Sequence, residues 1–307
     1  MKDSLFICFT VYQLKLAKLI IENNVIDDYL VIYFGESNSK VNSFLTKNKL
    51  TKIHFFEYEG SKIIKYLYLY YFIKKLNLNR VENIFVATLN AKEIKIILSC
   101  IVFDNIIGFD DGLGSILPHR KNGLYVESSG FLLKAFFKIL GLNKYKNLHT
   151  KINKFYGVYP EKFYGFNEFE RIKIINKDTI SVDFPKKEIK KIFIGQPYVN
   201  IGIDRDKILR FIVKNNIDYY LPHPAESEKM NFKNVVVTDV LSEDFIVDMV
   251  RDGYDVYIYS LFSTVIFNLC CVDNISCFGL YNDELILKYP DVYKLMDDFS
   301  IDKLKIE

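Results

Sequence analysis

Residues 4–34 read SLFICFTVYQLKLAKLIIENNVIDDYLVIYF, and this stretch decides the fold class. The apolar run over Ser4–Thr10 is typical of a buried strand, and the amphipathic pattern of Gln13–Asn24 is typical of a helix. A second apolar run follows over Asp28–Phe34. A strand, a helix and another strand in this order predict a βαβ unit whose strands pair in parallel.

The same alternation continues through the first half of the chain. Further strands are predicted at Lys52–Tyr58, Glu82–Thr88 and Asn105–Phe109, and helices at Ser39–Asn48, Ser61–Leu76 and Lys92–Cys100. Strict alternation of strands and helices predicts a parallel sheet with helices on both of its faces.

The pattern changes over Ile172–Lys191, which is polar, charged and interrupted by Pro185, as a linker is. Alternation then restarts with segments at Lys191–Gly195, Asp206–Lys214, Asp218–Leu221, Val235–Val240, Glu243–Arg251, Val256–Tyr259, Thr264–Cys271 and Ser276–Leu280. We therefore expect two doubly wound Rossmann-like domains: residues 1–185 with the linker, and residues 186–307 with a C-terminal tail. Two such α/β domains facing a central cleft form the GT-B architecture, in which ligands sit at the carboxyl ends of the strands.

Composition narrows the class of protein. The chain has 307 residues, of which 50% are hydrophobic, and a formal net charge of +3, with its basic residues spread along the sequence. A nucleic-acid binder concentrates its basic residues on one face, so we expect no nucleic-acid partner. The five cysteines show no CxxC spacing, which favours buried free thiols in a reducing compartment. They are Cys8, Cys100, Cys270, Cys271 and Cys277.

The lengths of the apolar runs indicate whether the chain enters or crosses a membrane. The N-terminal run is too short for a secretory signal, and the block Tyr66–Ile73 is far shorter than the about 20 residues of a spanning helix. We therefore expect a cytoplasmic protein. Two basic, aromatic segments, Lys62–Lys75 and Phe131–Lys146, could make peripheral contact with the inner membrane surface. For Lys62–Lys75 the sequence favours a helix packed on the sheet with its lysines in solvent.

Two carboxylates follow the strand Asn105–Phe109 directly. Asp110 and Asp111 precede the glycine-rich string that ends at Ser115. A carboxylate at the carboxyl end of a strand suits a general base, and the adjacent charge can raise the pKa of one of the two. The alternative is an ordinary turn, because Asp-Gly and Gly-Ser pairs are common turn formers.

Two further strings stand at strand ends in the second half. His223-Pro224 follows the strand Asp218–Leu221, where an imidazole could protonate or hydrogen-bond a phosphate leaving group. Ser263 or Thr264 is a good N-cap for the next predicted helix, and a helix start is also an anion site. The alternatives are a capping or buried histidine and a serine that only caps.

Asp204-Arg205-Asp206 spells the DxD string that metal-dependent glycosyltransferases use. It stands at the predicted start of a helix, where acidic residues favour the helix dipole in any case. No cluster of histidines, cysteines and carboxylates has the spacing of metal ligands. We expect no metal and no cofactor.

The order and spacing of these strings resemble a trio shared by bacterial sialyltransferases: Asp-Asp-Gly, His-Pro, and a Ser/Thr pair about forty residues later. Four stretches are similar to glycosyltransferase family 52 in particular. They are the opening strand and helix, Phe109–Ser115, Ile194-Gly195-Gln196-Pro197 and Ser260–Val265.

The resemblance implies a GT-B fold and inverting transfer of sialic acid from CMP-sialic acid without a metal. The implied acceptor is a terminal galactose of lipooligosaccharide or capsule, bound by the first domain. The implied donor site comprises His223, Pro224, Ser263, Thr264, Ser260, Gly195 and Gln196, and the acceptor-side residues are Gly112, Gly114 and Ser115. His223 would act on the CMP phosphate as acid or hydrogen-bond donor.

The base stays open between Asp111, Asp110 and Asp204, in that order. Asp204 enters because the family's base can also lie in the second half, shortly before the His-Pro pair. Two other functions stay open too. One is a family 52-like enzyme with another donor such as UDP-glucose, which should need a pyrophosphate cradle; the other is a non-catalytic glycan- or nucleotide-binding module. The oligomeric state, including a homodimer, is also open.

Overall fold

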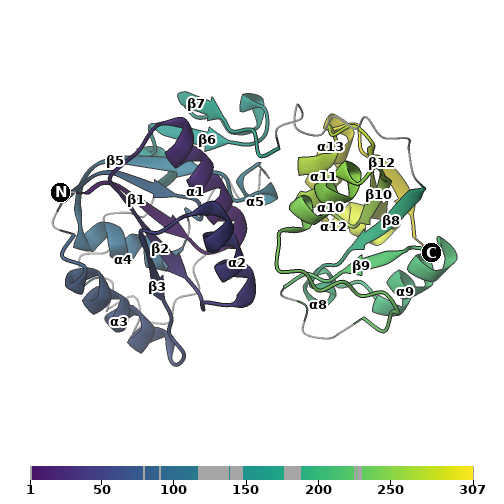
Figure 1. The fold of residues 1–307 in the computed structure, drawn as a ribbon, viewed down its shortest axis with the longest axis horizontal. Helices are drawn as coiled ribbons and strands as arrows, with labels where there is room; N and C mark the ends of the chain where they lie inside the picture. The colour runs from purple at the N-terminus through teal and green to yellow at the C-terminus, as the bar shows by residue number, and fades with distance from the viewer. Residues whose placement is uncertain are drawn as a thin grey trace. The chain divides into compact units, whose positions relative to one another are not determined.

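The computed structural model describes residues 2–78, 80–89, 91–116, 138, 148–175, 188–224, 226 and 230–306. The chain forms two compact units, Met1–Ile174 and Ile175–Glu307, each built on its own parallel sheet (Figure 1). The domain boundary expected at residues 185 and 186 lies outside the described residues.

Unit 1 is a seven-stranded parallel sheet in the order β3-β2-β1-β4-β5-β6-β7. The strands are β1 (Lys2–Cys8), β2 (Tyr29–Phe34), β3 (Ile53–Phe56), β4 (Arg80–Val86), β5 (Val102–Phe109), β6 (Lys154–Gly157) and β7 (Glu168–Arg171). The helices are α1 (Val11–Asn23), α2 (Ser39–Asn48), α3 (Lys62–Lys75), α4 (Lys92–Cys100) and α5 (Leu113–Ile116), with 3-10 turns η2 (Leu148–Lys151) and η3 (Glu161–Phe163). The predicted βαβ unit is confirmed, since β1 and β2 pair in parallel.

The strand order reverses between β1 and β4, so α1 and α2 lie on one face of this sheet and α3 and α4 on the other (Figure 1). Residues Leu5–Cys8 of β1 have no exposed surface, which explains the unbroken apolar run of the opening stretch. Thr10 accepts a hydrogen bond from the backbone N–H of Gln13 at 3.2 Å and so caps α1.

Unit 2 is a five-stranded parallel sheet in the order β12-β11-β10-β8-β9. The strands are β8 (Ile189–Ile194), β9 (Tyr219–Leu221), β10 (Asp255–Ser260), β11 (Ile275–Tyr281) and β12 (Asp302–Lys305). The helices are α8 (Tyr198–Ile201), α9 (Arg205–Lys214), α10 (Ser242–Arg251), α11 (Thr264–Leu269), α12 (Asp283–Lys288) and α13 (Pro290–Asp298). Both units are doubly wound α/β sheets, as a GT-B chain requires.

Two sequence-based expectations, for a strand in the second half and for the thiols, were wrong. Val235–Val240 is not a strand: Val235 makes an isolated bridge to Tyr220, and the side chain of Val237 is 85% exposed. The C-terminal tail contributes β12, which pairs with β11 at the edge of the sheet. All five cysteines are free, but Cys271 is exposed rather than buried.

Helix α3 packs against the rest of unit 1, as expected, but it also carries apolar surface. Tyr66, Leu69 and Ile73 pack inward, but four apolar side chains face outward along one stripe. They are Ile64, Leu67, Tyr68 and Tyr71, with exposed fractions of 56%, 39%, 51% and 67%. The outer face of α3 is therefore apolar as well as basic. The segment Phe131–Lys146 lies outside the described residues except for Lys138. No described helix is long and apolar enough to cross a bilayer.

A buried carboxylate ties β5 to the segment after β6. Asp110 has no exposed surface; its Oδ1 accepts a hydrogen bond from Gly112 N at 2.7 Å, and its Oδ2 accepts one from Val158 N at 3.0 Å. The Tyr164 hydroxyl donates a further short hydrogen bond to Oδ2. Burial raises the pKa of Asp110 from 3.8 to about 6, although the hydrogen bonds from Tyr164 and Val158 oppose this rise.

This raised pKa predicts a pH dependence of stability. The folded chain keeps the Asp110 proton over a range in which the unfolded chain has released it. The stability that Asp110 contributes is therefore fully present below about pH 4 and is lost as the pH rises through about 6. At about 1.4 kcal/mol per pH unit of this window, the loss is about 2–3 kcal/mol.

Urea unfolding between pH 4 and pH 7 measures the effect. Asp110→Asn removes the titrating group, so its free energy of unfolding should fall less over this range than that of the wild type. Asp104→Asn is the matched control, because Asp104 lies exposed on the same strand and should keep the wild-type slope. Equal slopes for the wild type and Asp110→Asn would contradict the prediction.

Candidate functional site

The first cluster of polar side chains in unit 1 is centred on Asp111. Its Oδ1 accepts a hydrogen bond from Gln13 Nε2 at 2.5 Å, and its Oδ2 accepts one from the Thr88 hydroxyl at 3.2 Å. Gln13 is 1% exposed, and its Oε1 accepts the backbone N–H of Phe9 at 2.6 Å. The cluster thus joins the segments that follow β1, β4 and β5, at the point where the strand order reverses.

The expected acceptor-side residues form the turn that orients Asp111. Gly112 has a φ of +76°, a left-handed conformation that glycine adopts without steric cost. The Ser115 hydroxyl accepts the backbone N–H of Asp111 at 2.8 Å, and Ser115 N donates to Gly112 O at 3.0 Å. Gly114 lies within the short helix α5 that follows. The turn holds the Asp111 backbone at a fixed angle.

The two adjacent aspartates differ in their surroundings. Both oxygens of Asp110 accept hydrogen bonds from protein donors, and the side chain is fully buried. Asp111 is half-buried, and its hydrogen bonds to Gln13 and Thr88 come from uncharged groups. A half-buried carboxylate in a fixed orientation can accept a proton from a bound hydroxyl, whereas a fully enclosed one cannot reach a ligand.

Sequence reasoning did not single out Gln13 or Thr88. Gln13 occupies a buried position on the apolar face of α1, and a polar residue in that place was the available signal. Thr88 gave no such signal, because a threonine at the end of a strand is common.

In unit 2, Gly195 and Gln196 follow β8. Gly195 N donates to Leu221 O at 2.8 Å, and a Cβ added at Gly195 would lie 2.1 Å from Glu226 Oε1. Only a residue without a side chain fits under that carboxylate. Gln196 is 7% exposed, and its buried Oε1 has no hydrogen-bond partner among the described residues. Such an acceptor is costly unless a ligand donor completes it.

Next to this position, His223 and Pro224 stand exposed just beyond β9. Glu226 reaches back to them: its Oε1 accepts the backbone N–H of His223 at 2.7 Å, and its Oε2 accepts the Tyr220 hydroxyl at 2.8 Å. The hydroxyls of Tyr220 and Tyr198 lie 2.9 Å apart. Burial raises the pKa of Glu226 above its ordinary value. Sequence reasoning missed Glu226, although it stands three residues after His223.

Ser260, Ser263 and Thr264 surround the start of α11. The buried Ser260 hydroxyl donates to Ile194 O at 3.3 Å and accepts Ser263 N at 3.3 Å, so it joins the ends of β8 and β10. Ser263 is the N-cap of α11, and its hydroxyl accepts Val265 N at 3.3 Å. The capping interpretation of Ser263 is therefore realised, and Thr264 is the first residue of the helix.

Asp204 has a different local role, which is to cap a helix. It is the exposed N-cap of α9, and its Oδ1 accepts the backbone N–H of Asp206 at 2.9 Å. The DxD string thus begins a helix. Within the described part of the chain, no three His, Cys, Asp or Glu side chains form a group that could hold a metal ion.

The fold of the whole chain has parallels among solved structures. The glycosyltransferase of kitacinnamycin superposes with a TM-score of 0.52 at 8% identity, covering 99% of this chain and 86% of that chain. At this identity the likeness concerns the fold alone, and it agrees with two doubly wound units of GT-B type.

Two curated relatives resemble the sequence itself. An N-acetyllactosaminide alpha-2,3-sialyltransferase of Haemophilus influenzae is 29% identical over 282 residues, which cover 89% of this chain and 90% of the relative. A CMP-N-acetylneuraminate:beta-galactoside alpha-2,3-sialyltransferase of Pasteurella multocida is 29% identical over 237 residues, 73% of each chain. The model of glycosyltransferase family 52 matches residues 18–280. With that match spanning both sheets and the Asp-Asp-Gly, His-Pro and Ser-Thr strings, the chain belongs to glycosyltransferase family 52.

Proposed function

We propose that this chain is a sialyltransferase that moves sialic acid from CMP-sialic acid to a terminal galactose of lipooligosaccharide or capsule, with inversion and without a metal. The names of both relatives support sialyl transfer, and the name of the Pasteurella enzyme includes the CMP donor and a β-galactoside. The structural observation that carries the chemistry is the half-buried Asp111 carboxylate, which Gln13 and Thr88 hold at the reversal of the strand order.

In the acceptor half, Asp111 is the proposed base. It takes the proton of the attacking sugar hydroxyl while the acceptor oxygen bonds to the anomeric carbon. Asp110 supports Asp111 by accepting the backbone N–H of Gly112 and so fixing the turn. Gly112, Gly114 and Ser115 form the acceptor side of the proposed site. Asp204 ranks last, because its carboxylate already caps α9.

In the donor half, His223 is the proposed partner of the departing CMP. As the anomeric C–O bond breaks, the phosphate oxygen gains charge, and the imidazole meets it with a hydrogen bond or a proton. Gln196 supports this assignment, because its buried Oε1 is ready to accept an N–H or O–H of the donor. Gly195, Pro224, Ser260, Ser263 and Thr264 complete the proposed donor site.

Glu226 is a proposed positioning residue for His223. Its carboxylate binds the His223 backbone N–H and the Tyr220 hydroxyl and rests on Gly195. It therefore fixes the backbone from which the imidazole projects, although it does not itself touch the donor.

The proposal places the chain in the cytoplasm, with peripheral contact to the inner membrane surface. The exposed stripe of Ile64, Leu67, Tyr68 and Tyr71 on α3 supports such a contact, and Lys74 and Lys75 lie exposed at the end of the same helix. This contact stays a prediction, which binding of the chain to anionic vesicles would test.

The first experiment tests donor and metal together. Purified chain should hydrolyse CMP-sialic acid slowly without an acceptor and should transfer it to lactose, and both activities should survive EDTA. UDP-glucose and UDP-galactose should not be consumed. Turnover that is lost in EDTA and restored by Mg²⁺ or Mn²⁺ would overturn the metal-free mechanism, and consumption of a UDP-sugar alone would overturn the donor.

The second prediction concerns the base. Asp111→Asn should lower kcat for transfer by about 10²–10⁴-fold, because it removes the proton acceptor. CMP affinity, titrated directly, should barely change, since the base faces the acceptor. Asp204→Asn is the matched control: asparagine caps a helix about as well as aspartate, so kcat should stay near the wild-type value. Near-normal transfer by Asp111→Asn would show that the base lies elsewhere.

The third prediction separates the groups around the phosphate. His223→Ala should mainly lower kcat, while the double change Ser263→Ala with Thr264→Ala should mainly raise the donor KM. Glu226→Ala should reproduce part of the kcat loss, but adding it to His223→Ala should cost no more, because both act through one imidazole. Additive losses would contradict the positioning role, and a fallen Tm with normal kcat per folded molecule would make His223 structural.

A further inference from the structure

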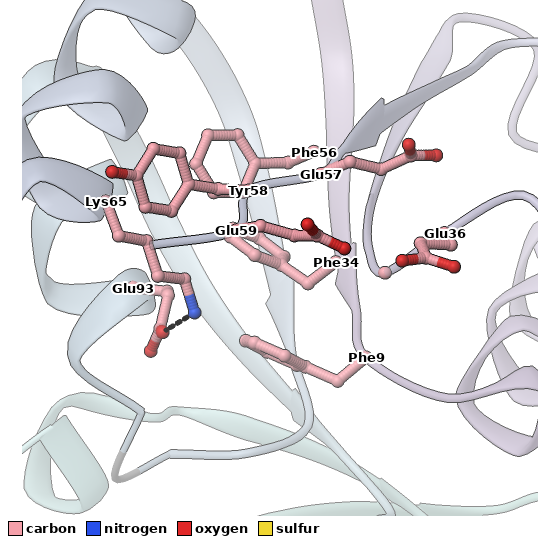
Figure 2. Close-up of a pocket in the computed structure, with 10 residues that line it drawn as sticks. Phe9, Phe34, Glu36, Phe56, Glu57, Tyr58, Glu59, Lys65 and Glu93 are labelled. Atoms are coloured by element: carbon pink, nitrogen blue, oxygen red, sulfur yellow. Dashed lines mark hydrogen bonds and ion pairs between the residues drawn. The ribbon is translucent and has the colours of Figure 1, made fainter. Parts of the chain in front are cut away.

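A cavity of about 470 Å³ opens at the carboxyl ends of β1, β2 and β3 in unit 1. These strands belong to the same sheet as β5, which precedes Asp111. Figure 2 shows its residues: Phe34 lies near the centre with Phe9 below it and Phe56 and Tyr58 above it, Glu59 lies next to Phe34, and Glu36 and Glu57 lie on one side of the rings. Neither the sequence strings nor the proposed mechanism uses these residues.

The rings form an aromatic cluster. Phe9 and Phe34 stack with centroids 4.7 Å apart at 19°, and Phe34 contacts Phe56 at 5.2 Å. Phe9 and Phe34 keep part of their surface exposed, whereas Phe56 is buried. An exposed ring face packs well against the C–H face of a sugar ring, and aromatic walls with a few polar groups are typical of small-ligand sites.

The rim of this cavity is negatively charged. Four carboxylates and one ammonium line the described part, for a net charge of −3 at neutral pH. Lys65 and Glu93 neutralise each other through an ion pair of 2.7 Å. The remaining carboxylates, on Glu36, Glu57 and Glu59, belong to exposed residues. Carboxylate oxygens accept hydrogen bonds from sugar hydroxyls, but they repel phosphate, sulfate and carboxylate groups.

The cavity is connected to the Asp111 cluster through Gln13. The backbone N–H of Phe9, at the floor of the cavity, donates to Gln13 Oε1, and Gln13 Nε2 donates to Asp111 Oδ1. The side chain of Gln13 therefore joins the backbone of a cavity residue to the carboxylate proposed as the base.

We propose that this cavity binds the uncharged terminal sugar of the acceptor, and that Glu36, Glu57 and Glu59 exclude glycan ends that already carry an acidic group. The inference rests on the proposed sialyl transfer. Its consequence is that the enzyme acts once on each terminus, because the product carries a new carboxylate that these side chains repel.

Binding without donor tests the inference directly. Saturation-transfer NMR titration of the whole chain with lactose and with sialyllactose should give a dissociation constant about tenfold or more higher for sialyllactose. Raising the salt from about 20 mM to about 300 mM should narrow this ratio, because the Debye length falls and the repulsion is screened.

Variants assign the effect to the cavity. Glu57→Gln with Glu59→Gln keeps the size of both side chains and should bring the two dissociation constants within about threefold. Phe34→Ala should weaken lactose binding. Glu82→Gln is the matched control, since Glu82 is exposed near the amino end of β4, away from the cavity, and should leave the ratio unchanged.

The outcomes separate this inference from the proposed function. If CMP-sialic acid is hydrolysed but lactose and sialyllactose bind equally, or the glutamine variant keeps the wild-type ratio, the cavity does not select by charge. Tighter binding of an amine-bearing sugar without binding of lactose would also overturn the inference. If neither hydrolysis nor transfer occurs while lactose is still preferred, the proposed function fails and the cavity remains a neutral-sugar site.

Discussion

The arrangement of unit 1 depends on the burial of one carboxylate. Asp110 stands at the end of β5 with no exposed surface, and it gathers donors from its own turn, from the segment after β6 and from Tyr164. Three hydrogen bonds offset most of the cost of burying this group. The same bonds fix the turn at Gly112, and that turn decides where the next side chain, Asp111, points.

Asp110 and Asp111 are adjacent and chemically identical, but they differ in their surroundings. Asp110 is held by protein donors alone, while Asp111 keeps exposed surface and is held by the uncharged Gln13 and Thr88. In unit 2 Glu226 orders a loop in a similar way, because it lies against Gly195 and accepts the backbone N–H of His223. In each unit an acid that is at least half-buried thus orders the loop that carries a more accessible side chain.

Much of the first sheet followed from the sequence, because β1 to β5 each contain an apolar run and alternate regularly with helices. The Asp-Asp-Gly and His-Pro strings were also found, since both follow strands directly. The roles of the two aspartates could not be predicted: the partners of Asp111 and Asp110 lie 98 and 54 residues away in the chain. β6, β7 and β12 were missed because each has only four residues, and because β7 and β12 are mostly charged. Val235–Val240 misled because valines resemble a strand even where they are exposed.

The parallel sheet also places the carboxylates of the cavity and the side chains of the Asp111 cluster on different segments of unit 1. Glu36 lies in the loop after β2, and Glu57 and Glu59 lie in the loop after β3, while Gln13 belongs to α1 and Thr88 and Asp111 belong to the loops after β4 and β5. Substitutions in the first two loops leave every hydrogen bond of the Asp111 cluster intact. The lining of the proposed sugar cavity can therefore change without rebuilding the Asp111 cluster.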